Sequence, residues 1–229
     1  MKAIALFSFL FIPISTFAQI TDTVFVITEK VTEVSQREIR SLFSRRPKDL
    51  YIDKDWQVTS ECMGEFGGTI TFINRATNER STAKATCPIA VHKIGEKYYV
   101  TNSLAHMSGF GSVYEISNPD LIDEVKPIEL IQEIGVTILG SFVYNNRLFH
   151  IVSRYDFNFD EHPNHVDKTG MYVARIENGE FVYIKMIGDP TLMTSSGVPF
   201  QADNGHVLIM LRNGYLDIFE NHITILRRK

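Results

Sequence analysis

The acidic segment that begins at Asp156 carries the most suggestive set of cation-binding side chains in the sequence. Asp156, Asn158 and Asp160 alternate as the first oxygen ligands of a calcium loop do. Asp167 falls at the twelfth position of the segment, where the final oxygen ligand of such a loop lies. Glu161 replaces the glycine that permits the sharp turn in these loops, and the last ligand is Asp instead of Glu. The pattern therefore predicts a divergent calcium site.

The same segment contains two histidines, which suit a different kind of metal. His162 and His165 offer imidazole nitrogens to a transition metal, with a neighbouring aspartate as the third ligand. The alternative is a solvated loop in which Phe157 and Phe159 pack inward, since acidic loops with a histidine are common on protein surfaces. Spacing alone leaves three interpretations open: calcium, a transition metal, or no metal.

A second group of polar residues, around His106, invites comparison with nucleophilic enzymes. His106 is close in sequence to Ser103 and Ser108, and a histidine beside a serine can act as its base. The segment lacks the Gly-x-Ser-x-Gly turn that presents a nucleophilic serine, and the spacing singles out no acidic partner. Gly109 and Gly111 lack the third glycine of a dinucleotide-binding turn. A tight loop between strands, or a loop that binds a partner, is the alternative interpretation.

Two glutamates, Glu61 and Glu65, form a third candidate. Paired carboxylates serve as acid and base in glycoside hydrolysis when the fold holds them at the required separation, which sequence does not give. The glycines around them, Gly64, Gly67 and Gly68, more simply indicate a bulge and a turn.

The densest basic cluster lies nearer the N-terminus. It contains Arg37, Arg40, Arg45, Arg46 and Lys48. Such a cluster can meet an acidic partner, a lipid or a polysaccharide surface. A solvated helix face is the simpler interpretation.

The two cysteines of the chain are Cys62 and Cys87. A pair of cysteines in an oxidising compartment is more often bridged than free, so the sequence predicts a structural disulfide. Closing a loop of this size stabilises a fold by roughly 3 kcal/mol in the chain-entropy model. The alternative is two separate buried thiols that act as small apolar side chains.

The first 18 residues have the organisation of a secretory signal peptide. Lys2 precedes an almost uninterrupted apolar run over residues 3–14. Thr16 and Ala18 supply the small side chains that signal peptidase requires, which predicts cleavage before Gln19. The run is shorter than the roughly 20 residues that span a bilayer. An uncleaved anchor or a buried N-terminal helix is the alternative.

Cleavage would leave 211 residues (229 − 18), and the loss of Lys2 would change the formal net charge from −4 to −5. This length suits a single domain over residues 19–229. The mild acidity argues against a nucleic-acid partner, and no later apolar run is long enough to anchor the chain in a membrane. The short basic start and the absence of a glycosylation sequon favour a secreted or periplasmic protein of the bacterial cell envelope.

Only one segment has a helical pattern, at about residues 36–45. Ser35 and Glu38 have the spacing of a capping box, in which a hydroxyl and a carboxylate satisfy free N–H groups at the start of a helix. Three apolar residues then share one helix face: Ile39, Leu42 and Phe43. Pro47 predicts the end of the helix, because proline lacks the N–H that the hydrogen-bond ladder needs.

From Trp56 onwards the chain is a series of short β-type runs separated by turns. Asn-Gly between two apolar runs is the strongest local signal of a β-hairpin. It occurs at Asn178-Gly179, Asn204-Gly205 and Asn213-Gly214. The first of these dipeptides predicts that residues 171–176 pair with residues 181–186. The C-terminal part of the chain is therefore predicted to be antiparallel β-structure.

These runs recur as a weak internal repeat. Turn spacing predicts three similar units, each preceded by a further apolar run: residues 95–130, 145–186 and 204–226. Residues 56–85 supply the strands of a fourth unit. About four units of four short strands resemble the blades of β-propeller proteins, and a strand over residues 23–31 would complete one sheet and close the ring. This resemblance implies an all-β fold. A β-sandwich is the alternative, since it gives the same strand spacing.

The sequence as a whole favours an exported all-β protein that binds or scaffolds rather than one that catalyses. We expect its loops near 103–112 and 156–167 to lie on one rim and to contact a protein, a glycan or another cell-surface ligand. No motif identifies a reaction, so no catalytic residue is assigned. The alternative is an extracytoplasmic, metal-assisted hydrolase, which needs His106 or the histidines of the acidic segment to converge with carboxylates.

Overall fold

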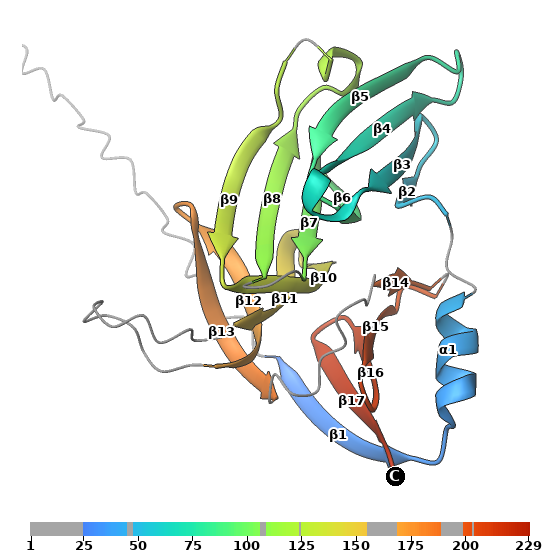
Figure 1. Cartoon of the computed structure of the whole chain (residues 1–229), viewed down its shortest axis with the longest axis vertical. Coiled ribbons are helices and arrows are strands. Elements are labelled where there is room, and N and C mark those ends of the chain that lie inside the picture. The colour runs from blue at the N-terminus through green and yellow to red at the C-terminus, as the bar shows by residue number, and fades with distance from the viewer. Residues whose placement is uncertain are drawn as a thin grey trace, which may run out of the picture.

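The computed structural model describes residues 25–44, 48–105, 109–123, 125–154, 169–188, 199–202 and 204–229. The predicted signal peptide, residues 1–18, lies outside these ranges. Within them the chain forms four small sheets and one α-helix, so the predicted all-β class is confirmed. Each sheet corresponds to one of the four predicted repeat units (Figure 1).

We number the sheets in chain order. Sheet 1 consists of β2 (Tyr51–Ile52), β3 (Trp56–Cys62), β4 (Gly68–Asn74) and β5 (Arg80–Ala85). Sheet 2 consists of β6 (Pro88–Ile94), β7 (Lys97–Leu104), β8 (Phe110–Ile116) and β9 (Ile128–Ile134). Sheet 3 consists of β10 (Val136–Tyr144), β11 (Arg147–Arg154), β12 (Gly170–Glu177) and β13 (Glu180–Gly188). Sheet 4 consists of β14 (Phe200–Gln201), β15 (Val207–Leu211), β16 (Gly214–Phe219), β17 (His222–Arg228) and β1 (Val26–Thr32).

Strands that follow one another within a sheet are antiparallel neighbours, so local turns determine most of the pairing. The predicted hairpin at Asn178-Gly179 joins β12 to β13, and both turn residues have positive φ angles, 52° and 82°. A tight hairpin needs this left-handed backbone, which asparagine and glycine adopt at little cost. The strand predicted over residues 23–31 also forms: β1 pairs with β17 and thereby completes sheet 4, in parallel orientation.

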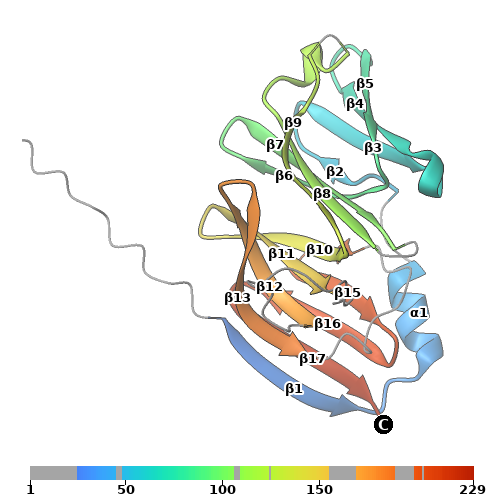
Figure 2. The ribbon, with the colours of Figure 1, turned by 60° about the vertical axis from the view of Figure 1, so that its left-hand side comes forward.

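Three buried apolar clusters join the sheets face to face in chain order. Val58 and Phe72 of sheet 1 pack against Val100 of sheet 2. Val113 of sheet 2 packs in one cluster with Val152 of sheet 3. A third cluster joins sheets 3 and 4, and it includes Phe149, Ile151, Ile209 and Leu216. Figure 2 shows the resulting array, with sheet 1 at one end and sheet 4 at the other.

The helix α1 (Gln36–Ser44) covers the face of sheet 4 that is turned away from sheet 3. Ile39 and Phe43 of the helix are buried against Leu208 of β15. The predicted capping box is present: Ser35 Oγ accepts the Glu38 N–H at 3.2 Å, and the Glu38 carboxylate accepts the Ser35 N–H at 2.8 Å. These hydrogen bonds fix the start of α1 at the predicted position.

The outer face of sheet 1 is polar. Thr59, Thr71 and Thr82 lie side by side across β3, β4 and β5, and the hydroxyls of Thr71 and Thr82 are 3.0 Å apart. A polar face needs no further apolar sheet, and repeat arrays commonly end in this way. The array is therefore propeller-like in the organisation of its sheets, but no closed ring is found among the described residues.

If α1 seals sheet 4, removal of its central apolar side chain will destabilise the protein. We expect Ile39→Ala to lower the free energy of unfolding by about 2–4 kcal/mol, because Ile39 is 1% exposed and its loss leaves a cavity. The matched control is Arg40→Ala, an exposed helix position where we expect a change of less than about 0.5 kcal/mol. Urea denaturation of both variants measures the difference, and equal effects would contradict a sealing role for the helix.

Candidate binding rim

The predicted metal site lies outside the described residues. This holds for all six proposed ligands: Asp156, Asn158, Asp160, His162, His165 and Asp167. His106 and Ser108 of the second candidate lie outside them as well. Within the described ranges, no three His, Cys, Asp or Glu side chains gather closely enough to hold a metal ion. Calcium and transition-metal binding by the acidic segment therefore stay predictions.

The predicted disulfide is present between Cys62 and Cys87, whose Cα atoms are 4.4 Å apart. Cys62 ends β3, and Cys87 lies in the connection from sheet 1 to sheet 2. The bond therefore braces the turn that contains the short 3₁₀ helix η1 (Gly64–Phe66). A backbone hydrogen bond from Ser103 N to Cys87 O, 3.1 Å long, ties the same point to the end of β7.

The other candidate residues are dispersed. Glu61 lies within β3 opposite Thr69, whereas Glu65 belongs to η1, and both side chains are exposed. Arg37 and Arg40 are exposed on α1. Of the remaining basic residues, Lys48 is exposed, and Arg45 and Arg46 lie outside the described ranges. A glycosidase-like carboxylate pair and a basic docking helix stay predictions.

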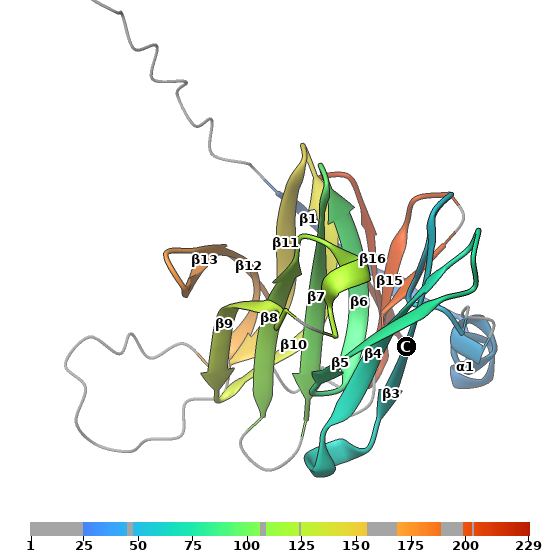
Figure 3. The same ribbon diagram turned by 90° about the horizontal axis from the view of Figure 1, so that it is seen from above.

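The strands that lead into the two predicted rim loops end at one edge of the array. Gly109, which precedes β8, accepts a hydrogen bond from the N–H of Gly135, which lies between sheets 2 and 3, at 3.1 Å. The next residue, Val136, pairs with Arg154 at the end of β11. We call this edge the rim; it comprises the η1 turn, the adjoining ends of β7, β8 and β9, the start of β10 and the end of β11 (Figure 3).

Large apolar side chains are exposed on the rim. Phe66 of η1 is 82% exposed, Met63 beside it is 57% exposed, and Ile134 at the end of β9 is 71% exposed. Ile134 lies directly opposite Phe110, which in turn lies opposite Leu104. Residues directly opposite one another share a face of the sheet, so these three form one apolar row across sheet 2. No sequence pattern singles out Phe66, because the exposure of an aromatic residue depends on what the fold packs around it.

A buried polar pair lies behind this row. Asn102 and Ser112 are directly opposite each other on β7 and β8, two residues further into the strands and on the same face. Both are fully buried, and neither side chain has a hydrogen-bond partner in the part of the chain that the structure describes. Each buried polar group without a partner lowers the free energy of unfolding by about 1–3 kcal/mol. The rim therefore combines exposed apolar groups with unused hydrogen-bonding capacity.

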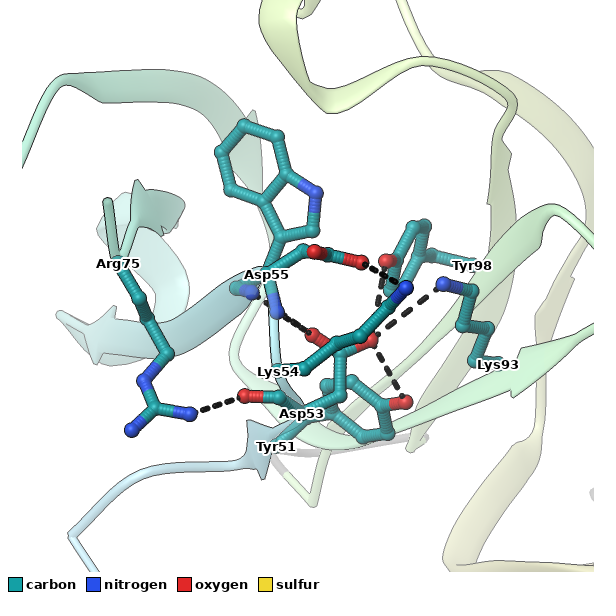
Figure 4. A network of polar contacts seen from close by, with 8 residues as sticks. Tyr51, Asp53, Lys54, Asp55, Arg75, Lys93 and Tyr98 are labelled. Atoms are coloured by element: carbon teal, nitrogen blue, oxygen red, sulfur yellow. Dashed lines mark hydrogen bonds and ion pairs between the residues drawn. The ribbon is translucent and has the colours of Figure 1, made fainter. Parts of the chain in front are cut away.

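A second polar network lies in the seam between sheets 1 and 2 and is centred on Asp53 (Figure 4). The Oδ2 atom of Asp53 accepts hydrogen bonds from Tyr51 Oη at 3.2 Å, Tyr98 Oη at 3.3 Å and Lys93 Nζ at 3.4 Å. Its Oδ1 atom accepts the N–H groups of Asp55 at 2.8 Å and Trp56 at 2.7 Å. The carboxylate is thus fully occupied by the protein itself, which is typical of a structural anchor.

The electrostatics of this network support the same interpretation. Burial opposes the charge of Asp53, but the Trp56 and Asp55 N–H groups and Lys93 hold the pKa of its carboxyl below the usual value. Burial, reinforced by Asp53, raises the pKa of Tyr51 to about 12. The Tyr51 phenol therefore stays protonated and donates to the carboxylate at all physiological pH values, unlike an activated catalytic tyrosine. In the sequence the only sign of this network is the Asp-x-Asp of a tight turn.

Comparison of the chain with protein-family models, with curated proteins and with solved structures finds no match. Among the described residues, no helix is both long and apolar enough to cross a bilayer.

If Asp53 anchors sheet 1 to sheet 2, its neutralisation will weaken that seam. We expect Asp53→Asn to lower the free energy of unfolding by about 1–3 kcal/mol at neutral pH, because Lys93 loses its charged partner and one acceptor oxygen becomes a donor. The matched control is Asp55→Asn, which removes only the exposed ion pair between Asp55 Oδ2 and Lys54 Nζ, 3.8 Å apart. We expect this variant to lower the free energy of unfolding by about 0–1 kcal/mol.

Thermal denaturation, followed through the fluorescence of the single tryptophan, compares the two variants. The Asp53 contribution should also fall as the pH drops through the depressed pKa of that carboxyl, because the carboxylate form makes the contacts. Equal stability of both variants would contradict the anchor.

Proposed function

We propose that this chain is an exported binding protein, and that it recognises a protein partner through the rim of its propeller-like array. The observation that carries the proposal is the exposure of Phe66 at 82% on a turn that the disulfide holds in place. Large apolar patches left in contact with water typically mark interaction sites. The proposal assigns no catalytic residue.

The composition of the rim favours a protein partner. Phe66 and Met63 are residue types that are enriched at protein–protein interfaces, and an aromatic ring on a rigid support loses little entropy on binding. The neighbouring row formed by Leu104, Phe110 and Ile134 extends the apolar surface beyond the turn. Binding would thus bury groups that the free protein leaves in water.

Export is supported by two features of the chain. The first 18 residues have a signal-peptide pattern, and the Cys62–Cys87 disulfide is a bond that persists mainly outside the reducing cytosol. We infer that the bond serves as a brace for the recognition turn, since it joins the end of β3, directly before that turn, to the connection that follows β5.

The binding proposal is tested by placing a photo-reactive benzoylphenylalanine at position 66 and irradiating cells of the native host. We expect a discrete cross-linked complex with a protein from position 66. The matched control position is Val125, which is 59% exposed in the connection between β8 and β9. Absence of a complex at position 66, or equal cross-linking at both positions, would contradict the assignment of the rim.

Substitution should then separate binding from stability. We expect Phe66→Ser to weaken affinity for the cross-linked partner by at least about tenfold, as loss of an aromatic anchor does, while Tm is unchanged because the ring is exposed. Val125→Ser should change neither quantity. Titration calorimetry and thermal denaturation measure the two effects.

Export makes a separate prediction about the mature chain. Protein recovered from the host should begin at Gln19 and fractionate outside the cytoplasm, because signal peptidase cleaves after the small residue Ala18. N-terminal sequencing of the fractionated protein decides the matter. Recovery of an intact Met1 terminus from the cytoplasm would contradict export.

A further inference from the structure

Two histidines lie within the seam between sheets 2 and 3. His92 belongs to β6 and His150 to β11, and both are buried. Ser141 of β10 is directly opposite His150, and its Oγ lies 3.0 Å from His92 Nε2 and 2.9 Å from Thr101 Oγ1. The two imidazoles therefore flank one serine at the point where the middle sheets of the array meet.

His150 is an unfavourable residue for this position. It is 0% exposed, and neither ring nitrogen has a hydrogen-bond partner among the described residues. Its ring instead lies edge-on to Phe181, with the ring centroids 5.8 Å apart. An apolar side chain would leave no polar group unpaired here, so His150 weakens the seam at every pH and weakens it further when it is charged.

Burial lowers the pKa of His92 to about 4 and that of His150 to about 3, and His92 adds to the effect on His150. Both values lie below the ordinary histidine pKa of about 6.5. Above that pH the imidazoles are neutral whether the seam is closed or open. As the pH falls from about 6.5 towards 4, an open seam takes up protons that the closed seam does not, so acid favours opening.

No carboxylate is hydrogen-bonded to either imidazole within the described ranges. On sheet 2, Glu115 forms an ion pair with Lys97 at 2.7 Å. The negative charge of Glu133, also on sheet 2, contributes to the raised pKa of Tyr183 on sheet 3. Arg154 of sheet 3 donates to Tyr183 Oη at 3.5 Å. Two further titratable groups face this seam: Tyr99 and Tyr172. A proton on His92 or His150 would therefore meet hydroxyls and apolar side chains instead of a negative charge.

Among the described residues, neither neighbouring seam buries a histidine. The cluster between sheets 3 and 4 is aliphatic and aromatic. The seam between sheets 1 and 2 is held by the Asp53 network and by the disulfide-braced connection. Acid should therefore act first on the middle seam.

We propose that His92 and His150 form an acid-operated latch between sheets 2 and 3, closed when both imidazoles are neutral and released when they are protonated. While the seam is closed, protonation of one histidine makes protonation of the other less favourable, because two like charges would share one site. Parting of the sheets removes this repulsion. The rim spans both sheets, so release would also disturb the binding face. That consequence rests on the proposed function, whereas the latch itself does not.

Hydrogen exchange of the full chain, read by mass spectrometry at about pH 7 and about pH 4.5 and corrected for intrinsic rates, tests the latch. We expect the hydrogen-exchange protection of β6, β10 and β11 to fall at least about tenfold at the lower pH. The reason is that the two histidine pKa values are lowered in the closed seam, so acid favours the open one. Strands β3 and β4 should keep theirs, and Trp56 fluorescence, which reports on the seam between sheets 1 and 2, should stay native. Unchanged protection, or equal loss in all four sheets, would overturn the proposal.

Substitution assigns the effect to the seam. In His150→Phe, or in His150→Leu if the larger ring is not accommodated, the acid response of β10 and β11 should be at least about tenfold smaller than in the wild type, and the response that remains should be that of His92. The matched control, His222→Asn, removes an exposed histidine and should respond as the wild type does. An undiminished acid response in both His150 variants would rule out the latch.

Discussion

Three buried apolar clusters hold the four small sheets of this protein face to face. A small sheet with an apolar face has to bury that face against another element. Sheets 2 and 3 bury both faces, and their strands are accordingly rich in apolar residues on either side. The end sheets solve the problem differently: sheet 1 presents threonines to solvent, and sheet 4 is covered by α1.

The same packing explains where polar groups are tolerated. Asp53 is accommodated in the seam between sheets 1 and 2 because five donors surround its carboxylate. His150 lies in the next seam without such partners, so burial there favours its neutral form. The seams therefore differ in their sensitivity to charge, although all three are built from apolar side chains of similar kind.

The rim differs from the seams because its turns are held by covalent and backbone bonds instead of by side-chain burial. The disulfide and the Gly109–Gly135 hydrogen bond fix the chain where few side chains are buried. Such support lets Phe66 remain in water without loss of the fold, as the proposed recognition turn requires. In that proposal the residues that bind a partner differ from those that stabilise the fold.

Local signals in the sequence account for the individual strands, turns and helix. Capping residues fixed the start of α1, Asn-Gly turns fixed the hairpins, and the spacing of apolar runs indicated four units of four strands, because these signals act over a few residues. Long-range packing establishes which faces meet, that α1 covers sheet 4, and that Phe66 is exposed while His150 is buried. Those outcomes depend on contacts between residues far apart in the chain, which the pattern of any single strand does not encode.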